Sequence, residues 1–235
     1  DESDRKRAYV IISDAFRYEA AQDLAQTLNG LYRMDAELGA MLGVLPSYTS
    51  LGMASLLPGQ DLAYTEKGDI AVDGDSVTGT EARNKQLEKV GGMACRAEEL
   101  RVMKLEEARE FTRGKRVVYI YHNVIDARGD TASTESETFS AVDECIKELV
   151  ELVQFCVNKL NAATVWVTAD HGFLFQKSAP GLTDKTALVQ KPDKAVKVKK
   201  RYVIGRALGV VHEAHHGYLT KTAKAGGDME FWVPR

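Results

Sequence analysis

The sequence predicts an α/β domain built on a mostly parallel β-sheet with helices on both faces. Continuous apolar runs, such as Tyr9–Ile12, Val117–Tyr121 and Thr164–Ala169, are typical of strands that are buried on both faces of such a sheet. Helical patterns separate these runs, and strands that alternate with helices favour a parallel sheet joined by crossovers. With 235 residues, of which 44% are hydrophobic, the chain can also fill a sizeable core.

The N-terminal part of the chain twice repeats the order strand, turn, helix. The first strand is followed by a helix with apolar residues four positions apart, which ends at Asn29-Gly30. The stretch ELGAMLGVLP predicts a second strand that ends near Pro46, and a short helix over Thr49–Leu57 comes next.

An insertion into the main sheet is predicted at about residues 61–95. Polar and apolar residues alternate over Asp61–Ser76, and Asp73-Gly74 is the signal of a hairpin turn. Polar helices are predicted at Glu81–Val90 and Ala97–Phe111, and they lead to the strand that begins near Val117.

The C-terminal part opens with the longest predicted helix, Glu135–Leu160, whose apolar stripe leads to a fully buried strand at Thr164–Ala169. The lysine-rich segment Lys191–Arg206 favours a solvated surface strand or loop, with nucleic-acid binding as the alternative. The apolar run Met229–Arg235 indicates a strand that needs a partner, so we expect the chain to be a piece of a longer polypeptide.

Composition bounds the location and the binding partners of the chain. The net charge of −3, from 31 basic and 34 acidic residues, gives no general attraction to nucleic acid or to a lipid surface, so an anionic substrate must be held locally. No apolar run approaches the length of a membrane span and no signal peptide opens the chain, which predicts a cytoplasmic protein without membrane contact. The three cysteines show no CxxC spacing, which argues against a disulfide framework or a cysteine zinc site.

Polar side chains that could bind a metal ion or take part in catalysis follow four of the predicted strands. These residues are Asp14, Ser47, Thr49, His122, Asp126, Asp130, Asp170 and His171. Because the carboxyl ends of parallel strands meet at one edge of a sheet, we expect these side chains to converge. Carboxylates and an imidazole brought together repel one another unless a cation neutralises them, and zinc, manganese and magnesium suit such ligands.

Each of these residues also has a simpler explanation. Asp14 and Thr49 could cap the helices that follow them, and Asp170 could form a turn with the next two residues. His122 is interpreted as a hydrogen-bonded core histidine, or one that supports a ligand, rather than a metal ligand. Four coincidences at one sheet edge are harder to explain by capping alone, and together they favour a metal site.

The segments VIISDAFRYE, LPSYTSLGMASLLPG, HNVIDARGD and VTADHGF, taken in order, resemble the PglZ family. This family is the phosphatase-like component of BREX phage-defence systems and a branch of the alkaline phosphatase superfamily. The resemblance runs from about Tyr9 to at least Arg206. It implies an alkaline-phosphatase-like three-layer sandwich, forming a single domain over residues 1–235 that is a fragment of a longer catalytic protein.

The resemblance also implies a ligand set for two divalent metal ions, zinc or manganese, with magnesium as a further option. Asp14, Asp170, His171 and the Thr49 hydroxyl match the first metal site. Asp126 and Asp130 match the second site, where a carboxylate at 130 replaces the imidazole of many relatives. A last histidine is expected beyond the present chain, so the second site is predicted to be incomplete, with His216 as the alternative ligand.

The activity that the resemblance implies is a metal-dependent phosphohydrolase, either a phosphodiesterase or a phosphatase, acting in antiphage defence. Thr49 matches the nucleophile, with Ser47 and Ser50 as alternatives, and Arg17 is one candidate for a phosphate contact. The expected partners are other BREX proteins and a phosphate ester, which includes nucleotides and nucleic acid. The alternative from a different class is a catalytically weak or inactive scaffold that docks other defence proteins.

Overall fold

The computed structural model describes residues 7–129, 138–174 and 192–235. The chain forms two compact units, and each is described here by itself. The first unit contains Asp1–Leu42 and Gly79–Phe175, and the second contains Gly43–Thr78 and Gln176–Arg235.

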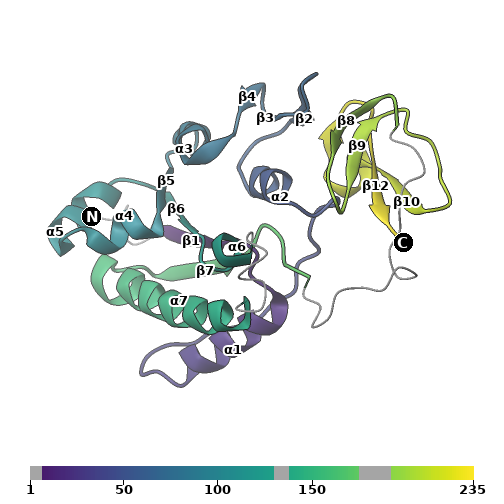
Figure 1. Cartoon of the computed structure of the whole chain (residues 1–235). Coiled ribbons are helices and arrows are strands. Elements are labelled where there is room, and N and C mark those ends of the chain that lie inside the picture. The colour runs from purple at the N-terminus through teal and green to yellow at the C-terminus, as the bar shows by residue number, and fades with distance from the viewer. Residues whose placement is uncertain (1–6, 130–137, 175–191) are drawn as a thin grey trace. The chain divides into compact units, whose positions relative to one another are not determined.

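Among the described residues, the first unit is built on a sheet of four parallel strands in the order β5-β6-β1-β7 (Figure 1). The strands are β1 (Ala8–Ser13), β5 (Met93–Arg96), β6 (Val117–His122) and β7 (Thr164–Thr168). The helices are α1 (Tyr18–Asn29), α3 (Gly79–Glu88), α4 (Ala97–Val102), α5 (Leu105–Thr112), α6 (Ile125–Gly129) and α7 (Thr138–Leu160). The predicted α/β class with a parallel sheet is therefore confirmed.

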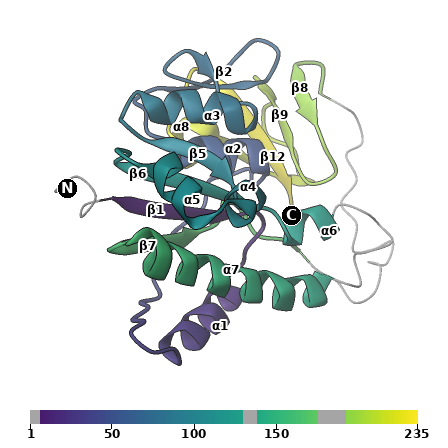
Figure 2. The ribbon, with the colours of Figure 1, turned by 90° about the vertical axis from the view of Figure 1, so that its left-hand side faces the viewer.

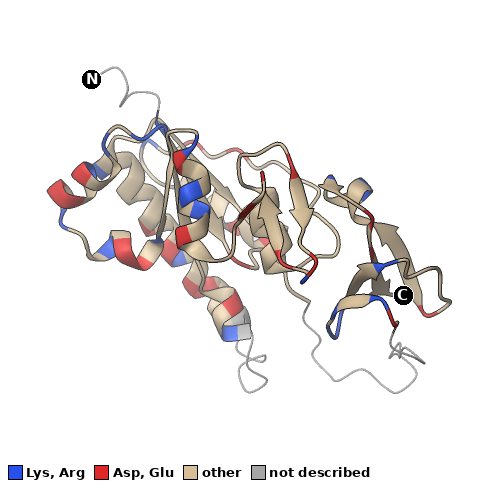
Figure 3. Cartoon of the chain, turned by 90° about the horizontal axis from the view of Figure 1, so that it is seen from above, with Lys and Arg blue, Asp and Glu red and all other residues tan. Residues whose placement is uncertain are grey.

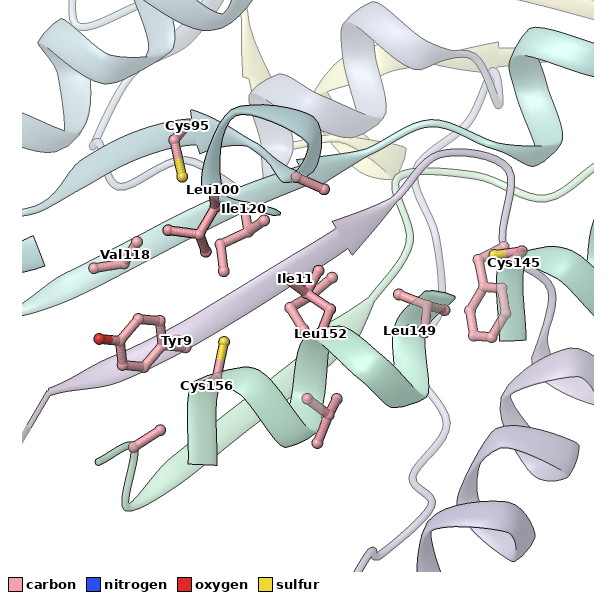
Figure 4. Packing of buried hydrophobic residues seen from close by; sticks show 14 of the residues in the cluster. Tyr9, Ile11, Cys95, Leu100, Val118, Ile120, Cys145, Leu149, Leu152 and Cys156 are labelled. Carbon is pink, nitrogen blue, oxygen red and sulfur yellow. The ribbon is translucent and has the colours of Figure 1, made fainter. Parts of the chain in front are cut away.

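One face of this sheet packs on the long helix α7. Alternate residues of the central strands, including Tyr9, Ile11 and Ile120, are fully buried in one cluster with α7 residues such as Leu149 and Cys156 (Figure 4). Helix α1 packs beside α7, and Figure 2 shows the two helices on the same side of the sheet. The period of two in the strands and the apolar stripe of α7 thus meet in a single core.

The opposite face of the sheet is contacted by α3 at its β5 end. Asn84 Oδ1 of α3 accepts a hydrogen bond from the Ala94 backbone N–H at 2.8 Å, and Leu87 is fully buried. The guanidinium carbon of Arg83 lies 4.7 Å from the centroid of the Tyr121 ring. Helices therefore cover parts of both faces, as predicted. Charged residues of both signs interleave along the surface helices of this unit (Figure 3).

The second unit contains two further sheets in its described residues. An antiparallel sheet has the order β10-β12-β9-β8, and a smaller sheet has the order β11-β2-β3-β4. The strands are β2 (Leu62–Tyr64), β3 (Ile70–Val72), β4 (Asp75–Ser76), β8 (Ala195–Val198), β9 (Val203–Arg206), β10 (Ala214–Tyr218), β11 (Ala225–Gly226) and β12 (Met229–Pro234). The helices are α2 (Thr49–Ser55) and α8 (Leu219–Thr222).

Several local predictions for the second unit are confirmed. The hairpin at Asp73-Gly74 joins β3 to β4, and both turn residues have the positive φ that such a turn requires. The terminal strand β12 finds partners in β10 and β9.

The described part of the lysine-rich segment, residues 192–206, differs from the prediction of a solvated strand or loop. It forms the β8–β9 hairpin, in which β9 is mostly buried.

The predicted strand that ends near Pro46 is wrong. Residues 35–44 form no strand, and Leu42 is 99% exposed. Two glycines interrupt this apolar stretch and it pairs with no strand among the residues described. Its hydrophobicity is therefore not a sign of burial.

Three further differences concern the first unit. Strand β7 lies at an edge of the described sheet and is not fully buried, since Trp166 is 63% exposed. The predicted helix Ala97–Phe111 is divided into α4 and α5, because the chain turns to extended backbone at Met103. Strand β5 was not predicted, and it lies inside the expected insertion at about 61–95.

The description of residues 1–235 as one domain stays a prediction. Within the described ranges, no helix is long and apolar enough to cross a membrane.

Candidate metal centre

Three neighbouring parallel strands deliver acidic side chains to one edge of the first unit. Asp14 directly follows β1, Asp126 lies in α6 just after β6, and Asp170 with His171 follow β7. The Asp14 backbone N–H donates to the His122 carbonyl oxygen at 2.8 Å, which extends the β1–β6 pairing up to the acid itself. The carboxyl-end rule for parallel sheets therefore explains why these residues meet.

The acid cluster, defined as Asp14, Asp126, Asp170 and His171, is tightly grouped. One potential ligand atom from each of Asp14, Asp126 and His171 lies within 4.8 Å of the other two. His171 Nε2 is 3.3 Å from Asp14 Oδ1 and 3.5 Å from Asp170 Oδ2. The other oxygen of Asp170 accepts a hydrogen bond from the Ala15 backbone N–H at 3.3 Å, which fixes the carboxylate.

The orientation of the His171 ring bears on what the cluster can bind. His171 Nδ1 lies 2.7 Å from the Gly172 carbonyl oxygen. A carbonyl oxygen can only accept, so Nδ1 donates in this contact, and Nε2 is the ring nitrogen that faces the oxygens of Asp14 and Asp170. A cation or a proton between these three atoms would hold them together.

The electrostatics of the two buried acids agree with this geometry. Burial, followed by the charges of Asp170 and Asp126, raises the pKa of Asp14 to about 8, while Arg83 acts in the opposite direction. Burial also raises the pKa of Asp170, against the opposing effects of His171 and of backbone hydrogen bonds. Asp14 Oδ1 and Asp170 Oδ2 are buried and accept no hydrogen bond from the described part of the chain. The donor set therefore fits a divalent cation with oxygen and nitrogen ligands.

Two predicted site residues lie outside the described part of the first unit. Asp130 lies outside the described residues. Thr49 is the first residue of α2 and belongs to the second unit, so its place beside the acid cluster stays a prediction. Its neighbours Ser47 and Ser50, the alternative nucleophiles, are both exposed.

Other predicted candidates have partners of their own. Arg17 forms an ion pair with Glu19, and its guanidinium carbon lies 4.9 Å from the centroid of the Phe173 ring. His216 Nε2 lies 2.8 Å from Glu230 Oε2, in the antiparallel sheet of the second unit. The roles of Arg17 as a phosphate contact and of His216 as a metal ligand stay predictions.

The interpretation of His122 as a hydrogen-bonded core histidine is confirmed. Its side chain is 2% exposed, Nδ1 lies 3.0 Å from Ser13 Oγ, and Nε2 lies 3.5 Å from Glu148 Oε2. Burial lowers the pKa of His122, although Glu148 acts against this shift. The Ser13–His122 contact ties the ends of β1 and β6 together just before the acid cluster. Arg83 was not predicted as a neighbour of this region, because nothing in the sequence of a polar helix marks which side chain faces the sheet.

Comparison with known proteins shows the family to which the chain belongs. Residues 1–235 match the family model described as the BREX system PglZ alkaline phosphatase-like domain. The chain belongs to the PglZ family. Among its curated relatives, the alkaline phosphatase-like protein BrxZ of Escherichia coli O9:H4 (strain HS) is 46% identical over 232 residues, which is 98% of this chain and 27% of the relative. The alkaline phosphatase-like protein PglZ of Bacillus cereus (strain H3081.97) is 42% identical over 182 residues, which is 77% of this chain and 21% of the relative.

Membership of the PglZ family confirms the resemblance that the four sequence segments carry. The chain spans about a quarter of the length of these two curated relatives. The parallel α/β sheet of the first unit is consistent with the alkaline phosphatase-like description of the family.

Proposed function

We propose that this chain carries the metal-binding part of a phosphoric ester hydrolase that acts in phage defence. One observation supports the proposal most strongly: His171 Nε2 lies 3.3 Å and 3.5 Å from buried oxygens of Asp14 and Asp170, with Asp126 in the same cluster. Such a donor set, at the carboxyl edge of a parallel sheet in a family described as alkaline phosphatase-like, suits metal-assisted hydrolysis.

The acid cluster is proposed to hold two divalent ions. Asp14, Asp170 and His171 would bind the first, for which zinc and manganese are the candidates. Asp126 and Asp130 would contribute to a second, oxygen-rich site, for which manganese or magnesium is suited and which we propose is incomplete in this chain. Bound there, the ions would supply Lewis acidity that offsets the charge of a phosphate group and favours the ionised form of a hydroxyl nucleophile.

The residues of the chain are proposed to divide the remaining work. Thr49 provides the hydroxyl that attacks phosphorus as the ester leaving group departs, and water then hydrolyses the phosphothreonine. Asp170 holds its position through the Ala15 backbone N–H, and His171 keeps Nε2 toward the cluster through the Gly172 carbonyl. This role for Thr49 requires α2 to lie beside the acid cluster, in the three-layer sandwich that we propose for the complete domain.

The wider role follows from the family description. We propose that the whole protein works with other BREX proteins in the cytoplasm, on a phosphate ester that includes nucleotides and nucleic acid. The lysines of the β8–β9 hairpin offer a surface for such an anion. Monoester and diester substrates both remain within the proposal.

Hydrolysis of a chromogenic phosphodiester and a chromogenic phosphomonoester tests this proposal. The chain, and a longer version extended to the length of its relatives, would be assayed with added zinc or manganese. We expect metal-dependent turnover that falls by at least about 100-fold in Thr49→Ala and in Asp170→Ala, because each would remove a group that acts on the reacting phosphate.

Ser55→Ala is the matched control for Thr49→Ala. Ser55 is a hydroxyl of the same helix that donates a hydrogen bond to the Gly52 carbonyl oxygen at 2.7 Å, so its removal should leave turnover within about twofold of wild type. A metal-loaded protein with no turnover above that of Thr49→Ala and Asp170→Ala contradicts the hydrolase proposal and favours the scaffold alternative.

A further inference from the structure

Helix α3 holds an arginine against the carboxyl end of the parallel sheet. The helix lies beside the edge strand β5 (Figure 1). It is fixed there by the Asn84–Ala94 hydrogen bond and by the buried side chains of Gln86 and Leu87. This anchoring determines where the half-buried side chain of Arg83 can reach.

Arg83 reaches the strand end that precedes the acid cluster. Its guanidinium carbon lies 4.7 Å from the centroid of the Tyr121 ring, in the second-last residue of β6. Tyr121 pairs in register with Ile12 of β1, and Asp14 follows two residues later, in the position that faces the same side of the sheet. The guanidinium and the Asp14 carboxylate therefore belong to the same corner of the first unit.

The positive charge of Arg83 lies at the corner of the unit that Tyr121 and Asp14 share. The same charge acts to lower the pKa of Tyr121, which burial raises to about 12. A cation that stacks on an aromatic ring is held in a defined orientation, from which its N–H groups can be directed at an anion.

A phosphate ester needs such a cation at this place. Three carboxylates repel an incoming phosphate, and the net charge of the chain provides no general attraction. Phosphoryl transfer spreads charge over the equatorial oxygens of phosphorus, where a guanidinium can donate two parallel hydrogen bonds.

We propose that Arg83 is the side chain of the first unit that contacts the phosphoryl oxygens of a substrate bound at the acid cluster. Tyr121 acts as its platform and Asn84 positions the helix that carries it. This inference rests on the proposed phosphohydrolase function and adds to it a residue that binds the anion.

Binding of inorganic phosphate tests the inference without requiring turnover. Phosphate would be titrated calorimetrically into the zinc- or manganese-loaded chain, for wild type, Arg83→Ala and Arg83→Lys. We expect Arg83→Ala to weaken phosphate binding by at least about tenfold, the value of one charge-assisted hydrogen bond, and Arg83→Lys to lie in between. Free guanidinium ion should restore part of the affinity in Arg83→Ala, and this variant should bind the metal at least as tightly as wild type, because a positive charge near the ligands is lost.

Lys85→Ala is the matched control, since Lys85 is an exposed cation on the same helix that pairs with Glu81 at 3.5 Å. It should leave phosphate affinity unchanged, whereas an equal loss in Lys85→Ala and Arg83→Ala would reduce the effect to general charge and overturn the inference. Wild-type phosphate affinity in a folded Arg83→Ala, judged by its unfolding midpoint, also overturns it, as does a metal-loaded wild type that binds no phosphate.

The outcome for the inference can be separated from the outcome for the proposed function. Metal-dependent ester hydrolysis with a KM and a phosphate affinity that do not respond to Arg83→Ala leaves the function standing and removes the inference. Phosphate binding that depends on Arg83, in a protein without turnover, supports the inference and contradicts the hydrolase function.

Discussion

Because His171 Nε2 faces buried oxygens of Asp14 and Asp170, we expect metal affinity and stability to change when one of these carboxylates loses its charge. Asp170→Asn keeps an oxygen for the Ala15 N–H but removes the buried negative charge. We expect this variant to bind zinc or manganese at least about tenfold more weakly, because a charged ligand is lost, and to unfold at higher urea when metal-free, by about 1 kcal/mol, because less charge is buried. Calorimetric metal titration and urea unfolding measure the two effects.

Asp143→Asn is the control for that substitution, since Asp143 is an exposed acid on α7. It should change neither metal affinity nor stability beyond about 0.5 kcal/mol. Equal metal affinity in wild type and Asp170→Asn would remove Asp170 from the proposed ligand set.

Ser13 and His122 show how a contact behind the cluster contributes to stability. Ser13→Ala removes the 3.0 Å partner of the buried His122 Nδ1 and leaves it only the more distant Cys145 Sγ, at 3.9 Å. We expect a loss of about 1–3 kcal/mol in unfolding free energy, the usual cost of leaving a buried polar group unsatisfied. Urea unfolding would measure it, with the exposed Thr220→Ala as the control, and a loss no larger than that of the control contradicts this role.

Glu230 gives the second unit a defined pH dependence. Burial acts to raise the pKa of Glu230, but hydrogen bonds with His216 and with the Leu208 and Gly209 backbone N–H groups outweigh it and lower the pKa. The carboxylate therefore adds stability above its unfolded pKa of about 4.3, and this stability is lost as pH falls through the lower folded value.

We expect Glu230→Gln to be about 1 kcal/mol less stable than wild type at neutral pH, and the difference to shrink as pH falls below about 4.3. Urea unfolding of both proteins across this range would show the convergence. A difference that stays constant with pH would mean that the interaction does not depend on the charge of Glu230.

At the scale of elements, the sequence predicts those whose pattern has one explanation. Strands β1 and β6 and the apolar stripe of α7 were predicted because each apolar pattern persists over several residues or turns. Burial on both faces was expected for β1, whereas burial alternates in its first half. The strand predicted around Leu42 was wrong, because an apolar stretch forms a strand only where a partner strand pairs with it. Strand β5 was missed because its four residues are too short for a period to be visible.

Strands β10 and β12 pack closely at Gly217, which leads to a testable prediction. A Cβ atom on Gly217 would overlap the Phe231 ring of the neighbouring strand. We expect Gly217→Ala to lose about 1–3 kcal/mol of unfolding free energy, because the ring must shift out of a packed position. Gly43→Ala is the control, since a Cβ atom added to Gly43 would meet no atom within 4 Å among the described residues. Equal midpoints in urea for the two variants would show that the ring moves freely.

For the whole molecule, the topology of the sheet predicted more of the site than any single sequence motif did. Asp14, Asp126 and Asp170 are far apart in the sequence, yet the rule that parallel strands end at one edge placed them together. The same rule does not reach Thr49, because no strand of the described sheet precedes it and it belongs to the second unit. Arg83 was out of reach as well, since its position depends on how α3 packs against β5.

Metal binding should be visible in the stability of the whole chain. A cation that binds only the folded state raises the unfolding free energy, by about 2.7 kcal/mol at a concentration 100 times its Kd. We expect zinc or manganese to produce such a rise and a chelator to reverse it, measured by urea unfolding. Asp170→Asn should respond far less, and an equal response in that variant would place the ion elsewhere.

The order of synthesis gives the parallel sheet one more consequence. Strand β1 leaves the ribosome before its neighbours β6 and β7, which begin only at Val117 and Thr164. Until they emerge, both edges of β1 lack their native partners, and its apolar residues are open to chaperones. The hydrogen bond from Ala15 to Asp170 spans 155 residues, so the acid cluster is assembled only when β7 has been made. Any cation held there must be acquired after that point of translation.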